Sequence, residues 1–307
     1  MKKIFALLMT AAFIVYLPAA SFAKGLVFGA SFMTMESSYF AVLDHTIRAV
    51  LNANGDTLIT LDPKRDKDKQ NAQIKELIKM GVDAIFLAPV NSWGAVEGLI
   101  ACKNAGVPVI NLDSPVYYEG LVDCIICSDN LNAGRLCAED LLKRTDGGKV
   151  VIIGNPGTKT GLDRVTKFVE IITEDPRFTL VADLDCKGNA KLTSTLTKGI
   201  IREMPDIAAI MCASDTIAMN AIEALREVGV KRRLLIYGVN GSPYAKEAIK
   251  KGYMAGTAAQ SPISMGQIGV ETAYQLMDGK KPDKHISVPV IFITAKNVDD
   301  FFQDGWQ

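Results

Sequence analysis

The sequence has few residues of the kinds that most enzymes use for acid–base or metal chemistry. Only two histidines occur among its 307 residues. His45 is predicted in the middle of a helix beside Asp44, and His285 follows a Lys-Pro-Asp-Lys turn, so we expect both to be surface or packing residues. No HExxH, GxSxG or EF-hand pattern is present. The sequence therefore predicts no catalytic site, metal site or cofactor, and it disfavours an enzyme.

The sequence also has no recognisable phosphate-binding loop. A glycine-rich turn, GNPGTKTG at 154–161, follows a predicted strand and opens a predicted helix. It matches neither the GxxxxGK[ST] nor the GxGxxG spacing that cradles a nucleotide phosphate. We interpret it as a Gly/Pro turn whose helix-end N–H groups face a cleft. The absence of a phosphate-binding loop removes the main support for the hypothesis that this protein is a nucleotide-dependent enzyme.

The chain has no excess of charge of either sign, since Lys plus Arg and Asp plus Glu both number 34. A protein that binds a phosphate backbone normally carries a basic surplus. We therefore predict no nucleic acid partner. Apolar residues make up 49% of the chain and charged residues 22%, a balance typical of globular domains.

A long apolar run occurs only at the start of the sequence. Lys2 and Lys3 precede the apolar residues 4–17, and Ser21-Phe22-Ala23 forms a small-x-small end. This pattern predicts a signal peptide over residues 1–23, cleaved before Lys24, and hence a periplasmic location. The apolar core is shorter than the ~20 residues of a membrane span, which disfavours an anchor.

Six cysteines in an exported chain raise the question of disulfides. Cys124 and Cys127 are three residues apart on a predicted strand, so their side chains point to opposite faces and cannot pair with each other. Cys212 falls on another predicted strand, and Cys102 and Cys137 fall on predicted helices. We expect small buried thiols, while the pattern leaves open whether any disulfide forms.

The body of the chain alternates predicted strands with predicted helices, beginning with a strand at 26–31. The clearest unit is 207–229, in which the apolar run IAAIMCA leads through Ser214 to an amphipathic helix that Gly229 ends, with Asp215 predicted as the N-cap. Such alternation predicts parallel sheets with helices on both faces. The chain contains two runs of about five strand–helix units each, which is too many strands for one sheet. We therefore predict two doubly wound α/β lobes. The last predicted strand is a short one at 288–293.

Polar side chains recur directly after the predicted strands. Because the carboxyl ends of parallel strands meet at one edge of a sheet, these residues should share a crevice. Carboxylate, guanidinium and amide groups bind hydroxyl groups, and aromatic faces cover apolar C–H surfaces, so the set suits a neutral, hydroxyl-rich molecule. The strand-end residues are Ser31, Asp113, Ser114, Ser128-Asp129-Asn130, Ser214, Asp215, Asn240 and Gln260, joined by Tyr39 and Phe40 at the start of a helix and by Arg164 in the first turn after the glycine-rich turn.

At these residues the chain resembles periplasmic sugar-binding proteins of the ribose-binding type, the type I solute-binding family of ABC transporters. The resemblance covers nearly all of 25–297 and rests on five segments: VPVINLDS at 107–114, CSDN at 127–130, AAIMCASDTIAMNAIEAL at 208–225, IYGVNGSP at 236–243 and GTAAQSPISMGQIGVE at 256–271. It implies two Rossmann-like lobes joined by a three-segment hinge. The implied crossings lie near 128–129, 260–261 and 289–290, which gives an N-terminal lobe of 24–128 plus 261–289 and a C-terminal lobe of 129–260 plus 290–307.

The resemblance also implies that eight residues contact the ligand: Ser31, Tyr39, Phe40, Asp113, Arg164, Ser214, Asn240 and Gln260. We predict that the adjoining Ser114 and Asp215 bind the ligand as well. The chain departs from the ribose pattern, with Ser114 in place of an arginine, Ala88 in place of an asparagine and Gly188 in place of an aromatic residue. A different pentose, a polyol or another small carbohydrate is therefore as well supported as ribose.

The family further implies a monomer that delivers its ligand to a membrane permease working with an ATPase. The alternative is a secreted sensing subunit for a chemoreceptor or sensor kinase, with no transport.

Overall fold

The computed structural model describes residues 25–232, 234–302 and 305–307. The predicted signal peptide lies outside these residues. Among the helices of the described part, none is both long and apolar enough to span a membrane.

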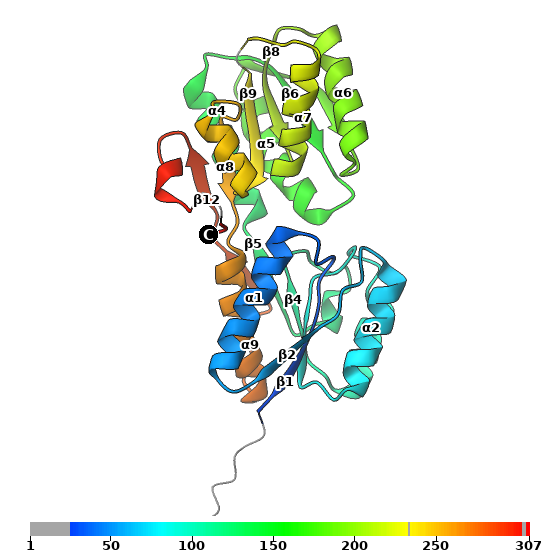
Figure 1. The fold of residues 1–307 in the computed structure, drawn as a ribbon. Coiled ribbons are helices and arrows are strands. Elements are labelled where there is room, and N and C mark those ends of the chain that lie inside the picture. Colours follow the sequence, from blue (N-terminus) through cyan, green and yellow to red (C-terminus); the bar gives the residue numbers. More distant parts are fainter. Residues whose placement is uncertain (1–24, 233, 303–304) are drawn as a thin grey trace, which may run out of the picture.

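The described residues form two six-stranded sheets, each with helices on both sides, stacked one above the other in Figure 1. The first sheet has the strand order β11-β5-β4-β3-β1-β2, and all its strand pairs are parallel. The lobe built on it is called the first lobe. Its strands are β1 (Val27–Ser31), β2 (Thr57–Thr60), β3 (Ala84–Leu87), β4 (Val109–Leu112), β5 (Cys124–Ser128) and β11 (His285–Val288).

The second sheet has the order β12-β10-β9-β8-β6-β7 and defines the second lobe. Its strands are parallel except for β12, which runs antiparallel to β10. They are β6 (Gly148–Gly154), β7 (Phe178–Asp185), β8 (Ile207–Cys212), β9 (Leu235–Asn240), β10 (Gly256–Ala259) and β12 (Ile291–Thr294). The predicted fold class, two doubly wound α/β lobes, is confirmed.

Helices cover both faces of each sheet because the buried strands carry apolar side chains on both sides. In β3, Ala84 and Phe86 pack with α1 and α9, whereas Ile85 and Leu87 pack with α2 and α3. In the second lobe α4 packs on α5, and α6 on α7. The helices are α1 (Ser38–Ala53), α2 (Lys67–Lys79), α3 (Val96–Ala105), α4 (Asn130–Arg144), α5 (Lys159–Glu174), α6 (Ala190–Glu203), α7 (Asp215–Glu227), α8 (Pro243–Lys250) and α9 (Pro262–Met277), with short 3₁₀ turns η1 (Glu119–Leu121) and η2 (Val298–Asp300).

The end of the chain differs from the sequence prediction. The single strand predicted over 288–293 is wrong: the structure has two strands, β11 in the first sheet and β12 in the second. Pro289 separates them, and proline lacks the N–H that would continue the pairing. Val290, next to it, already packs in the core of the second lobe. The break therefore carries the chain from one lobe to the other.

The contact between α4 and α5 depends on a glycine. A Cβ added at Gly134 would lie 2.0 Å from the backbone oxygen of Arg164 and 3.1 Å from the backbone nitrogen of Phe168. We expect Gly134→Ala to lower the free energy of unfolding by about 3 kcal/mol, because backbone atoms cannot move aside as a flexible side chain can. Urea unfolding followed by circular dichroism measures this.

Gly199→Ala in α6 is the matched control for this substitution. No atom lies within 4 Å of the Cβ that would be added there. Since alanine favours helix more than glycine does, the control should stabilise the protein by about 0.5–1 kcal/mol. Equal stability of the two variants would contradict the role given to Gly134.

Candidate functional site

Asp113 lies directly after β4, at the edge of the first lobe that faces the second. Its φ of 66° places it in the left-handed region, which is uncommon for a residue other than glycine. Its backbone N–H donates to the Ile126 carbonyl at 2.9 Å, and the Ser114 hydroxyl donates to its Oδ2 at 3.1 Å. Asn240, the last residue of β9, also has a positive φ, of 141°. Unusual backbone of this kind concentrates at functional sites, and here it occurs at the end of one strand in each lobe.

Arg164 comes from the second lobe and is held in place by its own lobe. It lies on α5 and is only 6% exposed. Its Nε donates to Asn130 Oδ1 at 2.7 Å, and its Nη1 donates to the Ala213 carbonyl at 3.0 Å. Among the described residues no hydrogen bond uses its Nη2. The guanidinium is thus fixed on one side while one amino group remains for another partner.

Asp113 and Arg164 are close enough for their charges to interact between the lobes. Burial raises the pKa of Asp113, and the positive charge of Arg164 opposes this rise. In turn, burial lowers the pKa of Arg164, and the negative charge of Asp113 opposes that fall. The hydroxyl of Tyr39 donates to Met265 Sδ at 3.5 Å. Burial raises the pKa of Tyr39 well above its usual value, and the negative charge of Asp113 raises it further. The structure therefore brings a carboxylate, a guanidinium and a phenol from both lobes together.

Gln260 links the two lobes at the point where the chain passes between them. Its Nε2 donates to Ser128 Oγ at 2.9 Å, at the end of β5 in the first sheet. Its Oε1 accepts from Asn240 Nδ2 at 2.6 Å, at the end of β9 in the second sheet. The side-chain amide of Gln260 also acts to lower the pKa of Asp113, against the effect of burial. One buried amide thus contacts both strand edges.

The prediction that Asp215 is the N-cap of α7 is wrong by one residue. Ser214 is the N-cap, and its Oγ accepts from the Ile217 N–H at 3.3 Å. Asp215 is fully buried: its Oδ2 accepts from the N–H and the Oγ of Ser242, both at 2.8 Å, and its Oδ1 accepts from Thr257 Oγ1 at 2.6 Å. Its backbone N–H donates to Asn240 Oδ1 at 3.3 Å. Asp215 therefore holds α7, α8 and β10 together beneath Asn240.

Three predicted contact residues are buried within the first lobe, and Tyr39, 6% exposed, is one of them. Ser31 is fully buried, and its Oγ accepts from Gln70 Nε2 at 3.3 Å. Phe40 is 5% exposed and stacks on Phe32, with the ring centroids 5.9 Å apart.

Two residues that support the site were absent from the predicted contact set. They are Asn130, which orients Arg164, and Gln70, which also donates to the Ala88 carbonyl at 3.1 Å. The position of Asn130 directly after a predicted strand is a sequence signal that could have identified it. Gln70 lies inside a polar helix, where no sequence signal distinguishes it.

All six cysteines lie in the described part and are unpaired; five are buried and Cys127 is half-buried. The expectation of small buried thiols is confirmed. Burial raises the pKa of Cys102 to about 12 and the pKa of Cys127 to about 11, so these thiols remain protonated at neutral pH.

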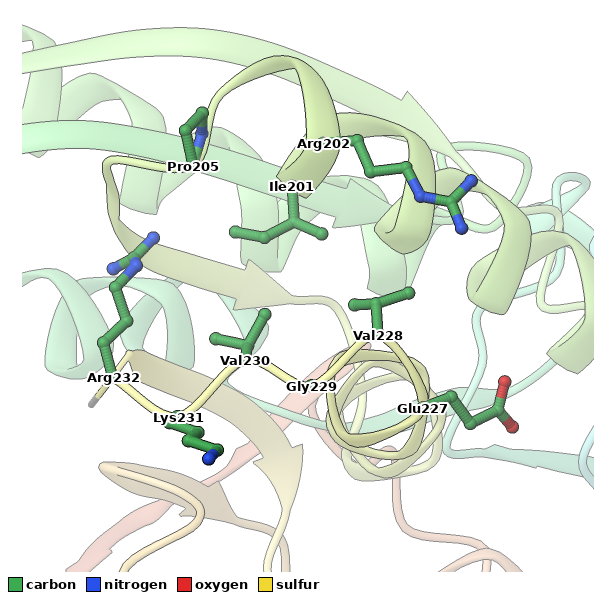
Figure 2. Close-up of a pocket in the computed structure, with 9 residues that line it drawn as sticks. All are labelled: Ile201, Arg202, Pro205, Glu227, Val228, Gly229, Val230, Lys231 and Arg232. Carbon is green, nitrogen blue, oxygen red and sulfur yellow. The ribbon is translucent and has the colours of Figure 1, made fainter.

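A pocket of about 800 Å³ lies at the opposite edge of the second lobe and is separate from this site. Figure 2 shows Pro205 and Val230 among the residues that line it. Pro205 precedes β8, and Val230 lies between α7 and β9, so the pocket is at the amino ends of these strands. Ser214 and Asn240 lie at the carboxyl ends of the same strands.

Comparison with solved structures agrees with this architecture. A solute-binding protein of an ABC transporter from Bacillus halodurans, solved with bound myo-inositol, matches with a TM-score of 0.82 and 24% identity over 90% of this chain and 97% of that one. A periplasmic solute-binding protein from Actinobacillus succinogenes, solved with D-allose, has a TM-score of 0.83 and 23% identity over 90% of this chain and 100% of that one. The fold is that of the two-lobe solute-binding proteins.

Sequence comparison identifies the family. Residues 28–281 match the periplasmic binding protein domain family, and the chain belongs to it. The ribose import binding protein of Bacillus subtilis is 29% identical over 275 residues, covering 89% of this chain and 88% of that protein. The D-allose-binding periplasmic protein of Escherichia coli is 26% identical over 230 residues, covering 72% and 73%. These relatives are sugar-binding transport proteins and not enzymes, so the resemblance seen in the sequence is confirmed and the chain is a solute-binding protein.

Proposed function

We propose that this protein captures a small neutral carbohydrate between its lobes in the periplasm and delivers it to the membrane permease and ATPase of an ABC importer. The observation that carries the proposal is the electrostatic interaction of Asp113 in the first lobe with Arg164 in the second, near Gln260. Family membership and the sugar-binding relatives support the class of ligand.

The proposed lobes are 24–128 plus 261–289 and 129–260 plus 290–307. The strands support this division, since β11 belongs to the first sheet and β12 to the second, with the change of sheet at Pro289-Val290.

We assign the ligand contacts by the hydrogen bonds that each group has left to make. Asp113 would accept two ligand hydroxyls, because a carboxylate offers about four acceptor positions and only some are occupied. Arg164 would donate from Nη2, and Asn240 would bind the same molecule from the second lobe. The remaining first-lobe contacts would come from Ser31, Tyr39, Phe40 and Ser114, and a further second-lobe contact from Ser214.

Asp215 would act by positioning Asn240 rather than by touching the ligand, since both its carboxylate oxygens already accept hydrogen bonds. Gln260 would couple binding to closure, because it is bonded to the strand ends of both lobes. A ligand that contacts both lobes binds the closed form better than the open one, and only such a difference shifts the equilibrium.

A thermal-shift screen tests the proposed function. The panel consists of D-ribose, D-allose, myo-inositol, other pentoses and hexoses, and linear polyols. We expect at least one member to raise the melting temperature, because a ligand that binds only the folded form stabilises it. Calorimetry would then give the affinity and the stoichiometry. Failure of every panel member at millimolar concentration would contradict the proposed function.

The affinity should depend on pH through Asp113. The carboxyl group accepts hydroxyls at both oxygens only when it is ionised, and burial raises its pKa above the usual value of about 3.9. Affinity should therefore be full at neutral pH and decline as the pH falls through the raised pKa, earlier than for an exposed aspartate. Calorimetry between about pH 8 and pH 4 measures this.

Asp113→Asn is the variant that tests the origin of this pH dependence. Its residual affinity should change little over the same range, because the amide does not titrate. A decline that persists unchanged in Asp113→Asn would assign the pH dependence to another group.

A further inference from the structure

Residues 301–302 contact the second lobe, and Trp306 near the end of the chain packs against the first. The segment 301–307 follows β12 and η2, and Phe301 packs on the core of the second lobe. The buried side chain of Lys246, on α8, donates to the carbonyl of Phe302 and, at 2.7 Å, to that of Gly305. The beginning of the segment is thus tied to the second lobe. In Figure 1 the end of the chain lies between the two lobes.

Trp306 packs into the core of the other lobe. It is only 7% exposed and belongs to the first-lobe cluster that contains Tyr39, Phe40 and Met265. Its ring meets that of Tyr39 edge to face, with the centroids 5.3 Å apart and the planes at 81°. Tyr39 is also the residue whose pKa the negative charge of Asp113 raises. The indole therefore packs directly against Tyr39, which is itself a residue of the candidate site.

Gln307, the residue after Trp306, contacts the hinge at Gln260. Its Nε2 donates to the Gln260 carbonyl at 2.8 Å and lies 3.5 Å from the carbonyls of Asn240 and Gly241. A Cβ on Gly241 would come within 2.4 Å of this Nε2, and the φ of Gly241 is +74°, so a glycine is needed for the approach.

Both side chains carry a buried polar atom without a partner. Within the described part of the chain, Trp306 Nε1 and Gln307 Oε1 are two of the three buried side-chain polar atoms with no hydrogen bond. Leaving such an atom unpaired costs about 1–3 kcal/mol, so native proteins rarely tolerate it. One atom is a donor and the other an acceptor, and a hydroxyl group can satisfy both kinds.

We propose that Trp306 and Gln307 are ligand-binding residues that form the hinge-side wall of the site. The indole covers an apolar C–H face of the ligand and its Nε1–H donates to a ligand hydroxyl, while Gln307 Oε1 accepts from a hydroxyl. Because the segment is anchored on the second lobe and Trp306 packs in the first, this wall is complete only in the closed form. The inference rests on the proposed function.

Calorimetry on the full chain, with a panel sugar that shifts the wild-type melting temperature, tests the inference. We expect Trp306→Phe, which keeps a ring and removes the N–H, to weaken binding about five- to tenfold. Gln307→Ala should weaken it by a similar factor. The melting temperature of unliganded Trp306→Phe should fall only slightly, since the smaller phenyl ring still packs against Tyr39 and no longer leaves a buried N–H unpaired.

Two substitutions serve as controls for the calorimetry. Phe302→Ala changes an 83% exposed residue of the same segment, and Trp93→Phe changes the chain's other tryptophan, which is 56% exposed. Neither should change the affinity. Trp93→Phe also leaves Trp306 as the sole indole, and adding the sugar should then change the position or intensity of tryptophan emission.

The two proposals fail in distinguishable ways. If wild type binds no panel sugar, the proposed function fails and this inference fails with it. If wild type binds a sugar but Trp306→Phe and Gln307→Ala bind it equally well and the emission does not respond, only the inference is overturned. A lowered melting temperature with unchanged affinity would show that Trp306 merely fills the core of the first lobe.

Discussion

Replacing Asp113 by asparagine should weaken ligand binding about 100-fold. The Asp113 carboxylate interacts electrostatically with Arg164 of the second lobe, and hydrogen bonds to a charged group contribute about 1.5–3 kcal/mol. Asparagine tolerates the left-handed backbone that Asp113 adopts at φ 66°, so this substitution removes the charge without straining the turn. Alanine would add a backbone penalty and mix the two effects.

Calorimetry with the panel sugar measures this loss. Arg164→Ala should weaken binding by at least tenfold, but it also removes the bonds to Asn130 and Ala213, so its effect includes local rearrangement. Asp206→Asn is the control: it changes an exposed aspartate, paired with Lys149, at the opposite edge of the second lobe, and should leave the affinity unchanged. Near-wild-type affinity in both Asp113→Asn and Arg164→Ala would refute the site.

Replacing Asp215 by alanine should give the largest loss of stability, about 3–5 kcal/mol for unfolding of the second lobe. The substitution removes three hydrogen bonds to a buried charged group and leaves the Ser242 N–H and the Thr257 hydroxyl without an acceptor. It also removes one of the two negative charges that stabilise the buried guanidinium of Arg164.

Urea unfolding of the unliganded protein tests the role of Asp215. Thr216→Ala is the matched control, because Thr216 is the next residue in the same helical turn and is exposed, with its hydroxyl near that of Tyr244. The control should change stability by less than about 0.5 kcal/mol. A small effect of Asp215→Ala, similar to that of the control, would show that its three hydrogen bonds contribute little.

The fold was predictable to a large extent because its signals are local. The buried run 207–213 and the amphipathic helix after it gave β8 and α7 within a residue or two. The N-cap was misplaced because serine and aspartate are both good capping residues and stand next to each other, so spacing cannot separate them. Only the tertiary structure shows that Thr257 and Ser242 bind the Asp215 carboxylate and leave Ser214 as the cap.

The sequence predicted which residues of the candidate site lie at strand ends. It did not predict which of these residues form hydrogen bonds with one another. Asp113 could be placed at the edge of one sheet, and Asn240 and Gln260 at the edge of the other, because parallel strands end together. The bond from Asn130 to Arg164 joins residues 34 apart, and the bond from Gln260 to Ser128 joins residues 132 apart. Such pairs depend on how helices pack and where the chain changes lobes, which hydrophobic periodicity does not specify.

By itself the sequence determined the repeated strand–helix order, and hence the two α/β lobes and the polar edge of each, because apolar periodicity and turn residues act over a few residues. The tertiary structure alone decided which polar groups meet across the lobes. It also decided that Pro289 divides the last predicted strand between two sheets, and that Trp306 packs against Tyr39 in the opposite lobe. The physical reason is that these contacts join residues far apart in the chain, and they exist only when both lobes are formed and placed against each other.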